Sequence, residues 1–164
     1  MSVQQASHFH PLPVIGHPDA YYVKQIELAE KAGDIHALES QKVGRYVTLA
    51  MDPAMPWEEK LRHLLHAMRR HCAPPPGATS GVQAFYQRLT DLVRRHASQE
   101  ALRFLAHETE SQRLRGPTSD PAMLHQQAVE LRKRIVGDAD VCPKWMTQEA
   151  WDQINRRLAR LTNL

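Results

Sequence analysis

The stretch that most constrains the fold is an amphipathic segment at residues 56–72, PWEEKLRHLLHAMRRHC. Apolar side chains recur along it every three or four residues, which is the period of an α-helix with one buried face. This apolar face consists of Trp57, Leu61, Leu64, Leu65 and Met68. The opposite face carries a polar series at the same spacing, Glu59, His63, His66 and Arg70. The segment therefore predicts a helix that packs by one face and presents the other to solvent or to a partner.

Helical periodicity continues along the chain, and no segment has the alternating pattern of a strand. Helices are expected at about 18–31, 34–50, 56–72, 80–96, 98–115, 120–136 and 147–161. In the second of them, the expected core positions are Ile35, Leu38, Tyr46 and Leu49. The fold class predicted from this pattern is all-α, a bundle of about seven amphipathic helices.

Several helix ends carry recognisable signals. Gly33 suits a left-handed C-terminal cap, and Asp34 directly after it suits the N-cap of the next helix. Ser80 and Gln83 match a capping box, and Ser98 and Thr147 are further N-cap candidates. Asp120 followed by proline is a typical N-cap and first helical position.

The prolines suggest how the chain is divided. Residues 1–18 hold three prolines within eight residues, which favours an extended N-terminal arm over a helix. Residues 19–164 are expected to form the helical bundle domain. The run APPPGATSG after Cys72 interrupts it, so a hinge is possible at 73–81.

Composition narrows the class of protein. Apolar residues make up 42% of the chain, too many for general disorder, and the net charge is only +3. The chain has only two cysteines, far apart in the sequence, and the simplest interpretation is that both are reduced, as in proteins of the cytosol. The N-terminus lacks the pattern of a signal peptide and no apolar run approaches membrane-spanning length, so the expected location is the cytoplasm.

Basic residues gather in the second half of the chain. Residues 83–164 carry 13 basic and 10 acidic side chains, against 8 of each in residues 1–82, and Arg outnumbers Lys by 15 to 6. Arginine suits contacts to phosphate, and scarce aromatic residues argue against reading bases by stacking. The candidates for contact with nucleic-acid backbone are Arg94, Arg95, Arg103, Arg132, Arg134, Arg156 and Arg157. The alternative is that these charges complement helix C-termini or are simply solvated.

Evidence for catalysis is poor. Glu59, His63 and His66 could coordinate a metal from one face of a helix. A catalytic metal usually lies in a cleft with ligands from several elements, however, and this helix face is expected to be exposed. We therefore expect no metal, cofactor or catalytic residue. The Glu59–His63–His66–Arg70 face is instead interpreted as a partner-binding surface. Cys72 continues the apolar face and suits a buried thiol.

The order of segments resembles one known family. WEEKLRHLLHAMRRHC, SGVQAFYQRLTDL, SQEALRFLAHE, AVELRKRI and a final helix containing tryptophan follow one another over residues 57–161. This succession resembles the helical small subunit of CRISPR Cascade-type surveillance complexes, which act in bacterial antiviral defence. The resemblance implies a non-enzymatic subunit that contacts RNA and DNA through basic surfaces, with Arg94, Arg95, Arg103, Arg132 and Arg134 at the matching basic positions. Residues 1–18 have no counterpart in that family.

Three functions remain open from the sequence. The leading hypothesis is a non-enzymatic accessory subunit of a nucleoprotein complex, with nucleic acid and other protein subunits as partners. The second is an adaptor or chaperone that binds only protein. The third is a metal-dependent enzyme that uses His63 and His66.

Overall fold

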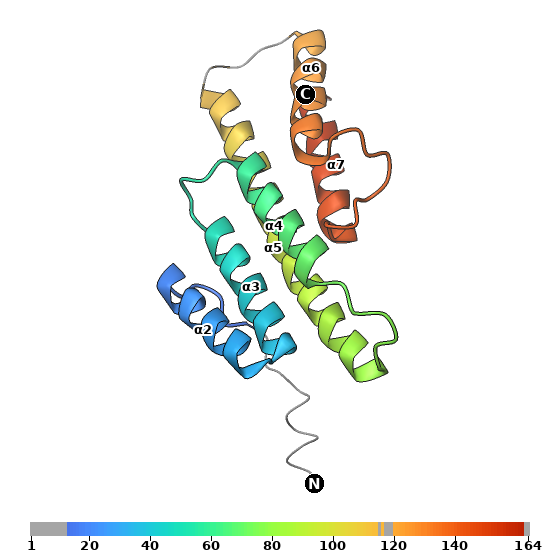
Figure 1. The fold of residues 1–164 in the computed structure, drawn as a ribbon. Coiled ribbons are helices and arrows are strands. Elements are labelled where there is room, and N and C mark those ends of the chain that lie inside the picture. The colour runs from blue at the N-terminus through green and yellow to red at the C-terminus, as the bar shows by residue number, and fades with distance from the viewer. Residues whose placement is uncertain (1–12, 115, 117–119, 163–164) are drawn as a thin grey trace. The chain divides into compact units, whose positions relative to one another are not determined.

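In the computed structural model, which describes residues 13–114, 116 and 120–162, every regular element is an α-helix (Figure 1). The helices are α2 (Asp19–Ala32), α3 (Ile35–Ala50), α4 (Trp57–His71), α5 (Ser80–Leu114), α6 (Pro121–Val136) and α7 (Gln148–Thr162). The expected all-α class is confirmed over these ranges. Within them, no helix is both long and apolar enough to cross a membrane.

The helices group into two compact units, Met1–Val93 and Arg94–Leu164. The first unit contains α2, α3, α4 and the start of α5, and the second contains the rest of α5, α6 and α7. The boundary between the units falls inside a continuous helix. The hinge expected at 73–81 overlaps the loop between α4 and α5, which belongs to the first unit, and it stays a prediction.

Several predicted helix ends are confirmed. Gly33 has φ 67° and ψ 22°, the left-handed conformation that glycine adopts without steric cost. The Asp34 carboxylate accepts the backbone N–H of Ala37 at 3.1 Å, and thereby satisfies one of the unpaired donors at the start of α3. In the second unit, Asp120 caps α6 in the same way, with Pro121 at the first helical position.

The described residues form six helices instead of the expected seven or so, because the segments at 80–96 and 98–115 are one helix, α5. No glycine or proline interrupts residues 82–114, so the backbone hydrogen bonds continue. Ser98, expected to begin a new helix, is buried instead, and its Oγ accepts the N–H of Thr147 at 2.9 Å. Thr147 in turn caps α7 as expected, since its Oγ1 accepts the N–H of Ala150.

The start of α5 also differs from the predicted capping box. Thr79, one residue before Ser80, accepts the N–H of Val82 through its Oγ1 at 3.4 Å. The Gln83 side chain donates to the carbonyl of Ala78 at 3.1 Å. The capping function is therefore displaced by one residue.

In the first unit, α3 packs against α2 and α4. Its buried residues are Ser40, Val43, Gly44, Val47 and Ala50, which share one face of the helix. Ile35 was expected in the core, but its side chain is 64% exposed. It lies at the first position of α3, off this buried face, which explains the error.

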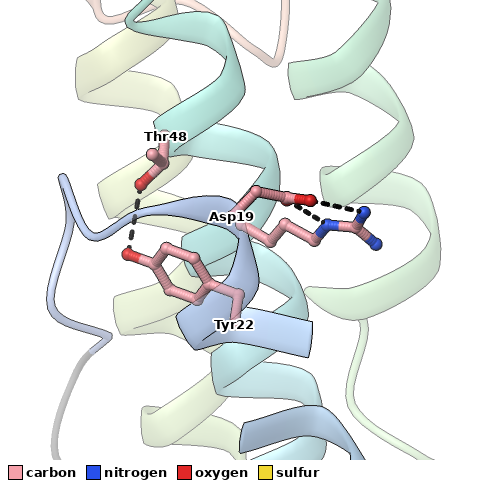
Figure 2. A network of polar contacts seen from close by, with 4 residues as sticks. Asp19, Tyr22 and Thr48 are labelled. Atoms are coloured by element: carbon pink, nitrogen blue, oxygen red, sulfur yellow. Dashed lines mark hydrogen bonds and ion pairs between the residues drawn. The ribbon is translucent and has the colours of Figure 1, made fainter. Parts of the chain in front are cut away.

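The segment just before α2 is held against α3. The backbone N–H of Gly16 donates to Thr48 Oγ1 at 3.0 Å, and Thr48 Oγ1 donates to the Tyr22 hydroxyl at 3.1 Å (Figure 2). The Tyr22 hydroxyl donates to the carbonyl of Val14. Residues 13–18 are thus fixed by a chain of hydrogen bonds, while the remainder of the expected arm, residues 1–12, lies outside the described residues.

This arrangement depends on Gly44 in the middle of α3. A Cβ added there would lie 2.8 Å from Pro13 Cβ and 2.8 Å from Tyr22 Cε1, closer than real Cβ contacts. The absence of a side chain therefore lets Tyr22 and Pro13 approach the helix backbone. A glycine inside a helix can mark a locally weak helix or a close approach by another part of the chain. At Gly44 the structure shows a close approach.

The second unit has its own core. Its buried apolar side chains include Ala97, Ala101 and Leu105 of α5, Ala128, Leu131 and Ile135 of α6, and Ala150, Ile154 and Leu158 of α7. Helix α6 packs against α7. Each unit therefore buries apolar faces within itself.

We predict that Gly44→Ala destabilises the chain, although alanine favours helix by about 1 kcal/mol. The new methyl group would displace Tyr22 and Pro13, and overpacking of this kind costs about 1–3 kcal/mol. Denaturant unfolding measures the change. Gly81→Ala in α5 is the matched control, because its Cβ would meet nothing within 4 Å, and we expect it to be neutral or stabilising. Equal effects of the two substitutions would contradict the close contact at Gly44.

Candidate functional site

A cluster of aromatic and imidazole rings lies between α3 and α4. The Tyr46 ring has three histidine neighbours, with centroid distances of 4.9 Å to His66, 5.8 Å to His71 and 6.2 Å to His63. The Tyr46 and His71 rings are stacked, with 19° between their planes. One tyrosine of α3 thus organises three histidines that lie apart along α4.

The cluster forms because the buried line of α4 differs from the expected one. That line consists of Trp57, Lys60, Leu64 and Ala67, and the predicted apolar residues Leu61, Leu65 and Met68 are only half-buried. The buried face is therefore turned toward the polar series. As a consequence, Glu59 and His63 are half-buried, while His66 and Arg70 are exposed. The expectation that this whole polar series faces away from the core is therefore wrong for Glu59 and His63.

An acid on α3 holds the last histidine of the cluster. Glu39 Oε2 lies 2.6 Å from His71 Nδ1, and the two side chains are only 18% and 11% exposed. A short contact between a carboxylate and an imidazole nitrogen at low exposure fixes the ring orientation. The bond engages Nδ1 and leaves Nε2 of His71 for another partner.

Beside this cluster is a groove of about 430 Å³ in which cationic side chains converge. Its described lining contains no acid and consists of Ile26, Lys42, Arg45, Tyr46, His66, Arg70 and His71. Three of these side chains, Lys42, Arg45 and Arg70, carry a permanent positive charge. The groove therefore has the electrostatic character of an anion site.

Besides Glu39, Asp19 borders the groove through an ion pair with Arg45. Asp19 accepts hydrogen bonds from Arg45 Nε at 2.7 Å and Nη2 at 3.2 Å (Figure 2). The hydrogen bonds from Arg45 lower the pKa of the Asp19 carboxyl from its ordinary value. Because a guanidinium has five N–H donors, Arg45 retains donors beyond those that face Asp19.

A second groove, of about 410 Å³, lies along α4. It is lined by Glu58, Leu61, Arg62, Leu65, His66, Arg69 and Arg70. The two grooves share His66 and Arg70, so they adjoin. Together they make a surface with five permanent cations, which we call the α3–α4 basic surface: Lys42, Arg45, Arg62, Arg69 and Arg70.

Four of the seven arginines predicted to contact nucleic acid bind groups within the second unit. Arg94 Nε donates to the carbonyl of Lys144 at 2.9 Å, and Arg132 Nη2 donates to that of Ala139 at 2.8 Å. Arg132 also lies over the Trp151 ring, 5.3 Å from its centroid. Arg94 therefore connects loop 137–147 to α5, and Arg132 connects it to α6.

The other two of these four arginines form ion pairs. Arg103 lies 2.6 Å from Glu100, and Arg134 lies 3.7 Å from Glu108. Arg134 also lies over the Phe104 ring at 4.6 Å. The remaining three predicted arginines, Arg95, Arg156 and Arg157, are exposed.

Neither cysteine forms a disulfide, and one of them is strongly shielded. Burial raises the pKa of the Cys72 thiol to about 12, and the negative charge of Glu39 acts in the same direction. The thiol is therefore protonated at neutral pH and is a poor nucleophile. Among the described residues, no group of three histidine, cysteine or acidic side chains is arranged to hold a metal ion.

The sequence interpretation missed Glu39, Lys42 and His71, and assigned Tyr46 to the core. A signal was present, because residues 39, 42 and 46 share one face of a helix by their spacing. The spacing does not indicate which other helix packs beside this face, and it is α4 that brings Arg70 and the histidines to it.

Comparisons with protein-family models, with curated proteins and with solved structures found no match to this chain. The grooves and the charges that line them are therefore the basis on which function is argued.

We predict that iodoacetamide at pH 8 labels Cys142 in the native chain and leaves Cys72 unmodified. The raised pKa keeps Cys72 as the thiol, so its reaction is slower than that of an ordinary cysteine by about a hundredfold or more. Mass spectrometry of the digested protein measures both sites, and labelling in denaturant is the control.

The raised pKa of Cys72 also determines how its contribution to folding stability changes with pH. A thiol pKa raised in the folded state contributes stability that is complete below the ordinary value of 9.0 and is lost as the pH rises toward about 12. Rapid labelling of Cys72 in the native chain at pH 8 would show that the thiol is accessible and ionised.

Proposed function

We propose that this chain is a non-enzymatic accessory subunit that contacts the backbone of a nucleic acid within a larger complex. The observation that carries the proposal is the α3–α4 basic surface, where two adjoining grooves present five permanent cations. Proteins that bind nucleic acid without regard to sequence do so mainly by placing Lys and Arg against phosphates.

The acids near this surface offset only part of its charge. Asp19 is paired with Arg45, and Glu59 lies 3.6 Å from Arg62. Glu39 is directed at His71. Glu58 is the one acid among the described residues that line the two grooves. A phosphate chain along α4 would therefore meet an excess of positive charge.

The geometry favours phosphate contact over base reading. The Tyr46 ring, the aromatic group of the surface, is already surrounded by His63, His66 and His71 at 4.9–6.2 Å. A base would have to displace these rings to stack on it. Arginine and lysine, in contrast, reach phosphate oxygens without rearrangement of the helices.

The residues predicted as sites differ in how they fit this surface. His66 and Arg70, interpreted from the sequence as partner-binding, belong to the proposed nucleic-acid surface. Arg95, Arg156 and Arg157 are exposed and are proposed as additional contacts in the second unit. Arg94 and Arg132 donate to backbone carbonyls, and we propose that they act mainly in the structure of the second unit. Arg103 and Arg134 form ion pairs but are exposed, so they are proposed as weaker contacts. The free thiols are in keeping with a cytoplasmic location, which we also propose.

We predict that the chain binds single- or double-stranded nucleic acid with an affinity that falls steeply as salt rises. Replacing Arg69 and Arg70 by glutamine should weaken binding and lower the slope of log affinity against log salt by roughly two, about one per lost phosphate contact. Filter binding at several salt concentrations measures both quantities.

The matched control is the double variant Arg88→Gln and Arg113→Gln, which removes two exposed charges outside the α3–α4 basic surface. It should retain most of the affinity and the slope. Binding that is absent or independent of salt would contradict the proposal, and recovery of a protein partner without nucleic acid would favour an adaptor. Equal losses in the two double variants would show that the charge is not localised at α4.

A further inference from the structure

The groove beside Tyr46 differs from its neighbour in a way that specifies a ligand. Lys42, Arg45 and Arg70 converge on it together with two imidazoles, and its described lining includes no acid. The neighbouring groove along α4 contains Glu58 and two leucines. Each groove has three permanent cations, and the Tyr46 groove is the one whose described lining adds no acid to them.

We propose that the Tyr46 groove binds a phosphate monoester, such as the terminal phosphate of a nucleic-acid strand, and this inference rests on the proposed function. An internal phosphodiester carries one negative charge, whereas a phosphate monoester carries about 1.5 to 2 negative charges at neutral pH. A monoester also presents three oxygens that accept hydrogen bonds. It therefore matches convergent cations better than an internal phosphate does.

The lining supplies donors suited to those oxygens. Arg70 and Lys42 line the groove, and Arg45 keeps donors beyond those that bind Asp19. Nδ1 of His71 faces the Glu39 carboxylate, which only accepts, so Nε2 of the neutral ring is an acceptor and the donors to a phosphate come from the cationic side chains. Donors fixed by other contacts bind an anion at a smaller entropic cost.

The groove also has room for the group that carries the phosphate. Its volume of about 430 Å³ falls within the range of small-ligand sites. Ile26 and Tyr46 provide an apolar wall next to the cations. The shared chemistry is a phosphate monoester on a small organic group, and it could come from a strand end or from a free nucleotide.

The test compares three oligonucleotides of one sequence in filter binding with the full chain. One has a 5′ hydroxyl, one has a 5′ phosphate, and one has a 5′ hydroxyl and one additional nucleotide, so that it gains an internal phosphate instead. We expect the 5′-phosphorylated strand to bind on the order of tenfold more tightly than both others. The longer strand controls for the added charge.

Two variants locate the preference. Lys42→Gln removes a cation that lines only the Tyr46 groove, and it should abolish most of the preference for the 5′ phosphate. Arg62→Gln removes a cation that lines only the neighbouring groove, so it should weaken all three strands alike and leave their ratio unchanged. Thermal unfolding followed by circular dichroism checks that each variant is folded.

The outcomes separate this inference from the proposed function. Equal affinity for the phosphorylated and the longer strand overturns the inference, while salt-dependent binding of both leaves the proposed function intact. A preference that Lys42→Gln leaves unchanged also overturns it, because the site then lies elsewhere.

Titration calorimetry with a nucleoside monophosphate and with inorganic phosphate measures whether the groove binds a free phosphate compound instead of a strand end. If no strand binds but the monophosphate does, and Lys42→Gln removes that binding, the inference holds with a free nucleotide as ligand and the proposed function falls. If neither strands nor monophosphate bind, both are wrong.

Discussion

The packing of helix α3 between α2 and α4 is the constraint on which the rest of the first unit depends. On one flank, Gly44 lets Tyr22 and Pro13 lie directly on the helix backbone. On the other, Tyr46 and Glu39 meet histidines of α4. Because α3 is held on both flanks, its polar residues occupy fixed positions relative to those of α4.

This packing explains why positive charge accumulates beside α4. Helix α3 contributes Lys42 and Arg45, and α4 contributes Arg70 to the same groove. Like charges brought together in this way repel one another, and a surface that maintains them is more readily explained if an anion offsets the repulsion. Asp19 and Glu39 each engage one lining residue, Arg45 and His71, so they offset part of this charge.

Local signals in the sequence predicted much of the fold. Gly33, Asp34 and Asp120 act as helix caps through their own side chains or backbone conformation, which depend on few neighbours. Ser98 misled the prediction, because a serine before a helical segment can cap it or, as here, accept a hydrogen bond from a residue 49 positions away.

The candidate site was less accessible to sequence reasoning. His66 and Arg70 were recognised as a polar face, but their association with Lys42 and Tyr46 depends on which side of α4 is buried. Apolar residues on two adjacent stripes of α4 left that rotation undetermined. The predicted arginines of the second half were conspicuous in the sequence, yet Arg94 and Arg132 turn out to bind backbone carbonyls.

The most direct test of the α3–α4 basic surface is an NMR titration of the isotope-labelled full chain with a short oligonucleotide. The account predicts that the resonances that shift first belong to Lys42, Tyr46, His66 and Arg70, and that salt reverses the shifts. Shifts confined to the second unit, for example at Arg156 and Arg157, would contradict the assignment of the surface. A spectrum that nucleic acid leaves unchanged would contradict the function itself.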